Sequence, residues 1–132
     1  MSMFASQTQE TIALPFALPH TITIRKLTGR EYEAVQQAAI NIFRVGEARP
    51  RGFSVLMRKL LAKDITTTAA EVEQALRDPL TGFDRYAVIG AGLVSWTLTE
   101  KLDAVMDLDD EAAEFIAVAI MRLTKPALFQ AA

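Results

Sequence analysis

Apolar residues recur with helical spacing along most of the chain. One stripe begins at Tyr32 and a second begins at Phe53, and in both the charged residues fall on the remaining sides. The region near the N-terminus differs, because His20–Lys26 alternates threonine with isoleucine. A period of two built from β-branched residues predicts a strand, and the extended segment Ile12–Leu18 would pair with it as an edge.

The sequence also marks where three of these helices begin. Thr28–Glu31 and Thr68–Glu71 each place a glutamate three residues after a threonine, which is the pattern of a capping box. Asp107 or Asp109 would cap the last helix, and Pro126 limits its length.

The segment Tyr86–Thr97 is mostly apolar and predicts a buried helix, although Gly90 and Gly92 lower its helix propensity. Together these elements predict a mainly α fold, a small helical domain of about five helices with a short N-terminal β element. Residues 1–10 would form a flexible N-terminus, and residues 11–128 a single α-rich domain.

Composition narrows the range of partners. A length of 132 residues suits one domain, and a net charge of −2 gives no electrostatic reason to expect nucleic acid or an anionic membrane. The chain has no cysteine, which excludes disulfides and thiolate metal sites. Its first residues lack the basic start and apolar run of a signal peptide, and no apolar stretch reaches the ~18 residues of a membrane span.

The strongest pattern is an apolar run, Phe115–Met121, that covers every face of a helix. A helix that is apolar all round is either central in the core or shared with a partner. The sequence leaves both alternatives open. If the run is shared, the residues expected to carry association are Trp96, Phe115, Val118, Ile120 and Met121.

A basic group falls on one helix and the loop before it. Within it, Arg58, Lys59 and Lys63 occupy a charged face that is either simply solvated or a docking site for an acidic partner. Aromatic residues are not interleaved with these charges as they are in base-stacking surfaces, which argues against nucleic acid.

Three features suggest chemistry and are better explained without it. Gly90-Ala91-Gly92 imitates a dinucleotide-binding turn, but Ser95 replaces the third glycine and few residues remain for the rest of the sheet. His20 is the single histidine, and no nucleophile or metal set can be assembled around it. The acidic residues around Asp109 fit a helix start better than a cation site. We therefore expect no catalytic, cofactor or metal site.

The order of these motifs resembles a known family. An extended Thr21–Lys26 is followed by Leu27-Thr28-Gly29-Arg30-Glu31-Tyr32, then by helices, by Ser95-Trp96, and by a last helix from Leu108-Asp109-Asp110-Glu111 to Leu123-Thr124-Lys125-Pro126. Over about residues 20–128 this arrangement resembles the tail assembly chaperones of long-tailed, siphovirus-like bacteriophages and prophages.

The resemblance implies a non-enzymatic, self-associating protein. Such chaperones coat the long tape measure protein, keep it soluble and help to recruit tail tube subunits. They act in the cytoplasm of the bacterial host and are absent from the mature virion. Two alternatives stay open: a structural tail or connector subunit retained in the virion, and a dinucleotide-binding protein using Gly90-Ala91-Gly92.

Overall fold

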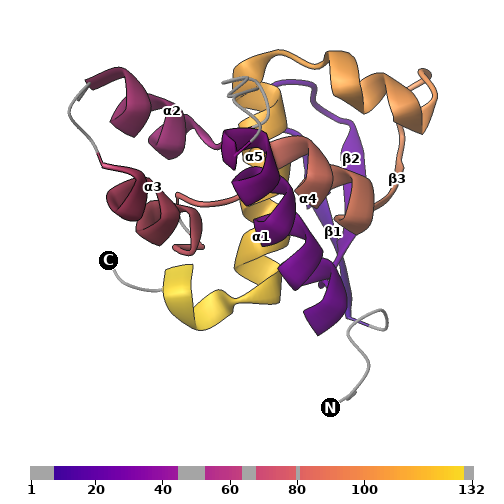
Figure 1. Cartoon of the computed structure of the whole chain (residues 1–132). Coiled ribbons are helices and arrows are strands. Elements are labelled where there is room, and N and C mark those ends of the chain that lie inside the picture. Colours follow the sequence, from indigo (N-terminus) through magenta and orange to yellow (C-terminus); the bar gives the residue numbers. More distant parts are fainter. Residues whose placement is uncertain (1–7, 45–52, 64–67, 80, 130–132) are drawn as a thin grey trace.

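The computed structural model describes residues 8–44, 53–63, 68–79 and 81–129. Within these residues the helices pack against one another and against a small sheet (Figure 1). Two short 3-10 helices flank the last α-helix, at Leu102–Asp107 and Pro126–Phe129. The strands are β1 (Gln9–Ala13), β2 (Thr21–Arg25) and β3 (Leu93–Trp96), and the α-helices are α1 (Gly29–Arg44), α2 (Val55–Lys63), α3 (Ala69–Leu76), α4 (Arg85–Gly92) and α5 (Asp110–Thr124).

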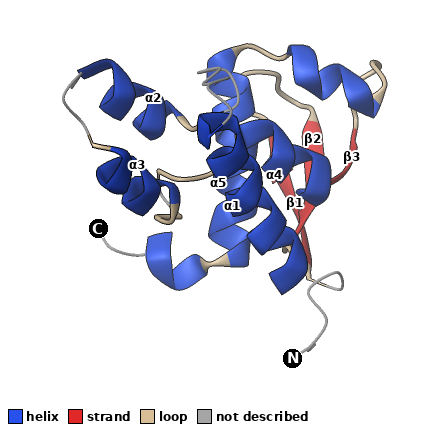
Figure 2. Cartoon of the chain, in the orientation of Figure 1, coloured by secondary structure: helices blue, strands red, loops and turns tan. Residues whose placement is uncertain are grey.

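The predicted fold class is wrong, because the described residues form a mixed α/β domain and not a mainly α one (Figure 2). The predicted helix Tyr86–Thr97 continues only to Gly92, and Leu93–Trp96 forms a third strand instead. Two glycines weaken the helix at the point where it stops. The residues that follow then gain backbone partners on β2, which helix propensity alone does not reveal.

The sheet is antiparallel, with the order β1-β2-β3. The predicted alternation in β2 is confirmed, since Ile22 and Ile24 are fully buried while the threonines between and before them are half-buried. On the opposite face Thr11 Oγ1 and Thr23 Oγ1 are hydrogen-bonded at 3.0 Å. Strand β1 begins at Gln9, inside the segment 1–10 that the sequence places in a flexible N-terminus.

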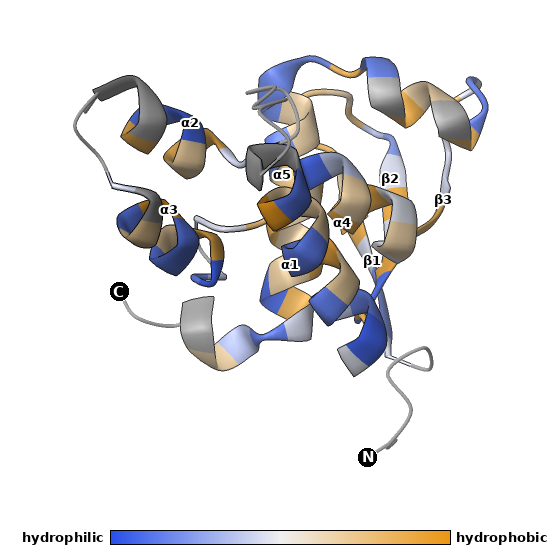
Figure 3. Ribbon diagram, in the orientation of Figure 1, coloured by the Kyte–Doolittle hydropathy of each residue, from blue (hydrophilic) through white to orange (hydrophobic). Residues whose placement is uncertain are grey.

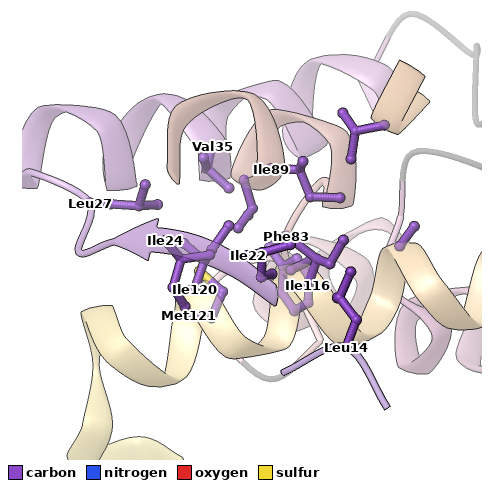
Figure 4. Close-up of a cluster of buried hydrophobic side chains, with 14 residues drawn as sticks. Leu14, Ile22, Ile24, Leu27, Val35, Phe83, Ile89, Ile116, Ile120 and Met121 are labelled. Carbon is purple, nitrogen blue, oxygen red and sulfur yellow. The ribbon is translucent and has the colours of Figure 1, made fainter. Parts of the chain in front are cut away.

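The main hydrophobic core lies where β2 meets α1, α4 and α5. Figure 4 shows Ile22 and Ile24 pointing among Ile116, Ile120 and Met121 of α5. A smaller, separate cluster joins the end of α1 to α2 and α3, and its buried members are Ala39, Ile40, Phe53, Met57, Val72 and Leu76.

Helices α4 and α5 approach each other closely at Gly92. A Cβ atom at Gly92 would lie 2.5 Å from Ile120 Cγ2, so no larger residue fits there without movement. Gly90 is exposed and would meet nothing within 4 Å. Of the two glycines, Gly92 alone is therefore required for packing.

The predicted helix starts are confirmed. Thr28 and Glu31 form a reciprocal capping box, in which each backbone N–H donates to the other residue's side chain. Thr68 caps α3 by accepting a hydrogen bond from Glu71 N–H. Of the two candidates for α5, Asp109 is the capping residue, and its carboxylate accepts from Glu111 N–H.

Glu31 also makes α1 sensitive to acid. Its carboxylate accepts hydrogen bonds from the Arg25 guanidinium, which lowers the pKa of Glu31 from an ordinary value near 4.5 to about 2. A lowered pKa in the folded state adds stability that is complete above about pH 5 and is lost as the pH falls towards 2.

We expect Glu31→Gln, which keeps the capping geometry but removes the charge, to lower the free energy of unfolding by about 0.5–1 kcal/mol at pH 7. The deficit should shrink as the pH is lowered from 5 to 2, as measured by urea denaturation. Glu33→Gln, exposed on the same helix, is the matched control. A deficit that stays constant with pH would contradict this account.

Candidate functional site

Helix α5 has two apolar faces, and only one of them is buried. Ala113, Ile116, Ala117, Ile120 and Met121 are turned into the main core. The other face borders an open groove of about 640 Å³ between α5 and strand β1. From α5 and the turn after it the groove is lined by Glu114, Phe115, Val118, Ala119, Arg122, Leu123 and Pro126, and from the sheet by Glu10, Ile12 and Ile24.

The groove exists because β1 is only partly covered. Ile12 stands opposite Ile22 on the face of the sheet that points to α5. Ile22 is fully buried, whereas Ile12 remains half-buried and lines the groove. Helix α5 thus covers the central strand and leaves the inner face of the edge strand open.

Large apolar side chains extend this surface at one end. The rings of Phe16 and Phe115 meet edge to face, with centroids 5.7 Å apart, yet Phe16 is 50% exposed and Phe115 36%. Leu18, in the same turn as Phe16, is 69% exposed. Exposed apolar side chains that gather around a groove are typical of a binding surface.

Charged groups mark the two ends of the α5 face. Arg122 is exposed in the last turn, and Glu114 lies half-buried in the first half of the helix. Burial raises the pKa of the Glu114 carboxyl, against the opposing effects of a hydrogen bond from Val55 N–H and of the nearby Arg85. Glu114 is therefore an acceptor held in place by α2 and α4.

An ionic cluster around the buried Arg85 fixes the N-terminal end of α5. Arg85 is fully buried and places Nη2 3.3 Å from Asp110 Oδ1 and Nε 4.0 Å from a Glu114 oxygen. Arg58 of α2 reaches the other oxygen of Asp110 at 2.9 Å, and this hydrogen bond lowers the pKa of Asp110. The cluster joins α2, α4 and α5, and its role is structural.

The structure divides the five residues that the sequence nominates for association. Phe115 and Val118 lie together on the groove. Ile120 and Met121 are fully buried in the core, so neither side chain is exposed at the groove. Trp96 stands on β3, at the sheet edge opposite β1, where its indole N–H donates to Glu100 O at 2.8 Å.

The three basic residues proposed for docking do not form one described patch. The Arg58 guanidinium forms an ion pair with Asp110, so it belongs to the ionic cluster that joins α2 to α5. Lys59 is exposed on α2. The side chain of Lys63 lies outside the described residues.

Sequence reasoning missed the part of the groove that α5 does not supply. Ile12 and Phe16 come from β1 and the turn after it, and their approach to α5 is a tertiary contact. On α5 itself a signal was present, because Phe115, Ala119 and Leu123 recur at a spacing of four residues.

The glycine pair occupies a different arrangement from the one a dinucleotide unit requires. That unit needs a strand, then a glycine turn, then the N-terminus of a helix. Here Gly90 and Gly92 lie within and at the end of helix α4, and a strand follows them. His20 Nδ1 is 3.1 Å from Thr97 Oγ1, beside the exposed end of the sheet.

Comparison with protein-family models, with curated proteins and with solved structures finds no match to this chain. Among the described residues no group of three acidic, histidine or cysteine side chains is placed to hold a metal ion. None of the described helices has the length and apolarity to cross a bilayer. Fold and site together define a small mixed α/β domain with an open apolar groove.

Proposed function

We propose that this protein is a phage tail assembly chaperone, which binds and shields the tape measure protein and assists assembly of the tail tube. The observation that supports the proposal is the open groove along α5, where the described residues leave an apolar helix face partly uncovered. Figure 3 shows α4 and α5 coloured mainly towards the hydrophobic end of the scale, whereas α1 carries many hydrophilic residues.

The groove suits a helical segment of a partner. An amphipathic helix binds such a groove with apolar residues repeated every three or four positions. A tape measure protein is a long helical chain whose apolar stripes are exposed until the tube encloses it, and the groove would cover one stretch of such a stripe.

Shielding follows from the same contact. Exposed apolar stripes drive aggregation, and covering them with a protein whose outer surface is polar removes that driving force. When tail tube subunits enclose the tape measure protein they cover the same stripes, so the chaperone would be released. Each step uses burial of apolar surface alone, without a cofactor.

We expect Val118→Asp to abolish the solubilising effect. Val118 lies in the middle of the groove face, and a carboxylate there would be desolvated by the bound helix without a partner. On co-expression with the tape measure protein of the same genome, the soluble fraction of that protein should fall at least tenfold. Ala34→Asp, an equivalent change on the exposed side of α1, should leave it unchanged.

Two results would contradict the proposal. One is a tape measure protein that stays equally soluble with Val118→Asp, provided that the variant melts like the wild type by circular dichroism. The other is mass spectrometry that detects this chain at structural stoichiometry in purified particles, which would indicate a tail or connector subunit retained in the virion.

A further inference from the structure

Strand β1 forms one edge of the sheet, and the face that it turns towards α5 is open. Helix α5 packs over the central strand β2, so the groove lies beside α5 and over β1, where the described sheet ends. Soluble proteins guard such an edge with proline, lysine or a bulge, or with a charge turned inward. Gln9–Ala13 contains no proline and no lysine, and its pairing with β2 is regular. Of these guards, an inward charge is the one that β1 can have.

The backbone of β1 offers hydrogen-bonding groups on the side away from β2. Thr8 O accepts from Lys26 N–H, so the even-numbered residues direct their backbone groups towards β2. The odd-numbered residues direct theirs to the side where the described sheet ends, and in β1 these are Gln9, Thr11 and Ala13. An antiparallel fourth strand would form about six hydrogen bonds with these three residues.

The side chains of β1 alternate between the two faces of the sheet. Ile12 stands opposite the buried Ile22, and Glu10 stands opposite the buried Ile24. Both Ile12 and Glu10 therefore point to the α5 side, and both line the groove. Directly opposite residues of paired strands share a face, so a fourth strand would add to the groove one side chain beside Ile12 and one beside Glu10.

Glu10 determines which charge suits the added strand. Its carboxylate is exposed and forms no ion pair within the described part of the chain, although Arg122 lines the same groove. The other carboxylate of the lining, Glu114, already lies 4.0 Å from Arg85. An apolar side chain beside Glu10 would remove water from the carboxylate without replacing it, whereas lysine or arginine would pair with it. Glu10 is thus an inward guard that favours a strand with a basic residue at this position.

A fourth strand would also lie beneath a helix bound in the groove. Packed helices are about 8–10 Å apart and neighbouring strands about 4.8 Å apart. A helix beside α5 is therefore displaced from β2 by about two strand spacings, which is the position next to β1. The described sheet ends one strand short of that position. An added strand would cover the part of the bound helix that β1 does not reach.

We propose that β1 binds an extended segment of a protein partner as a fourth, antiparallel strand, with an apolar residue opposite Ile12 and a lysine or arginine opposite Glu10. The pairing itself follows from the edge and its charge. Its consequence, a sheet completed beneath the tape measure helix, rests on the proposed function.

A synthetic peptide tests the strand directly. In acetyl-Val-Thr-Ile-Thr-Lys-Thr-Val-amide, laid antiparallel with its isoleucine opposite Ile12, the lysine stands opposite Glu10. Hydrogen exchange followed by NMR should show that the saturating peptide slows exchange of the Thr11 and Ala13 amides about tenfold more than that of Ile12. The reason is that the Ile12 N–H already faces β2, whereas the other two gain a partner.

The charge predicts a sequence preference. The wild-type chain should bind the lysine peptide about fivefold more tightly than the same peptide with glutamate in place of lysine, as measured by NMR titration. Glu10→Lys should reverse this preference. Gln9→Lys is the matched control, because the Gln9 side chain lies on the opposite face of β1, and this variant should still prefer the lysine peptide.

A proline substitution tests the role of the backbone. Thr11→Pro removes an N–H that faces away from β2 and should weaken peptide binding about tenfold or more. Thr11→Ala keeps that N–H and should bind within about threefold of the wild type. If Thr11→Pro does not fold, the exchange and charge experiments, which do not depend on it, still decide the question.

Three results would overturn the proposal. One is equal binding of the lysine and glutamate peptides by the wild-type chain. Another is equal slowing of exchange at Thr11 and Ile12. The third is protection of the Thr11 and Ala13 amides in the chain without peptide, which would show an edge already occupied, by a second copy if the protection grows with protein concentration and by the same chain if it does not.

These experiments contain no tape measure protein, which separates the two proposals. A chain that keeps the tape measure protein soluble but does not bind the peptide would reject the fourth strand and leave the proposed function standing. A chain that binds the peptide with the expected preference and has no effect on tape measure solubility would do the reverse.

Discussion

An alanine at position 82 should lower the free energy of unfolding by about 3 kcal/mol. Gly82 is buried, and a Cβ atom there would lie 2.1 Å from the carbonyl carbon and oxygen of Leu76. Those are main-chain atoms at the end of α3, so the clash cannot be relieved by a side-chain rotation. Relief requires movement of a segment whose last residue, Leu76, is fully buried in the smaller cluster.

Two other glycines, Gly92 and Gly90, are less crowded than Gly82, so alanine should cost less stability at each of them. Gly92→Ala would press on a side-chain atom of Ile120 and should cost about 1–3 kcal/mol. Gly90→Ala meets nothing within 4 Å and should stabilise the exposed side of α4 by about 0.5–1 kcal/mol. Urea denaturation should give a free energy of unfolding that increases in the order Gly82→Ala, Gly92→Ala, wild type, Gly90→Ala. A Gly82→Ala variant as stable as the wild type would refute the packing described at the end of α3.

Replacing the buried cation should be nearly as costly. Arg85→Met preserves much of the volume but leaves the half-buried Glu114 carboxylate without its nearest positive charge. Loss of one partner from a buried pair typically costs about 3–5 kcal/mol, and the exposure of Asp110 places this case near the lower end.

The pH dependence identifies the cause. Burial already raises the pKa of Glu114, and removal of Arg85 should raise it further. A carboxyl group whose pKa is raised in the folded state costs stability once the pH exceeds that pKa. Lowering the pH from 7 to 5 should therefore restore part of the stability that Arg85→Met loses. Arg58→Met, which removes the partly exposed cation that shares Asp110, should cost about 1 kcal/mol. If Arg85→Met loses the same stability at pH 7 and at pH 5, lost packing and not lost charge is responsible.

Local features of the fold could be predicted from the sequence. The capping boxes at Thr28 and Thr68, and the alternation in β2, depend on residues within a few positions of each other. Strand β3 could not be predicted, because Leu93–Trp96 becomes a strand only by pairing with residues 22–24, which are distant in sequence. Its local signal was the weakening of the helix by two glycines.

The candidate site was half predictable for a related reason. The run Phe115–Met121 is apolar on every face of the helix, so its hydrophobic pattern does not indicate which residues face the core. Tertiary contacts make that choice: Ile120 and Met121 are buried beneath the sheet, and Phe115 and Val118 border β1. The other wall of the groove comes from a strand at the far end of the chain.

Glu114 both lines the groove beside the main core and accepts a hydrogen bond from α2, which belongs to the smaller cluster. The smaller cluster contains too few residues to fold alone, so helices α2 and α3 depend on the rest of the domain for their stability. The first residue of α2, Val55, places its backbone nitrogen 3.3 Å from the Glu114 carboxylate that lines the groove. The position of α2 therefore sets one of the hydrogen bonds of Glu114, the acidic residue that α5 contributes to the lining of the groove.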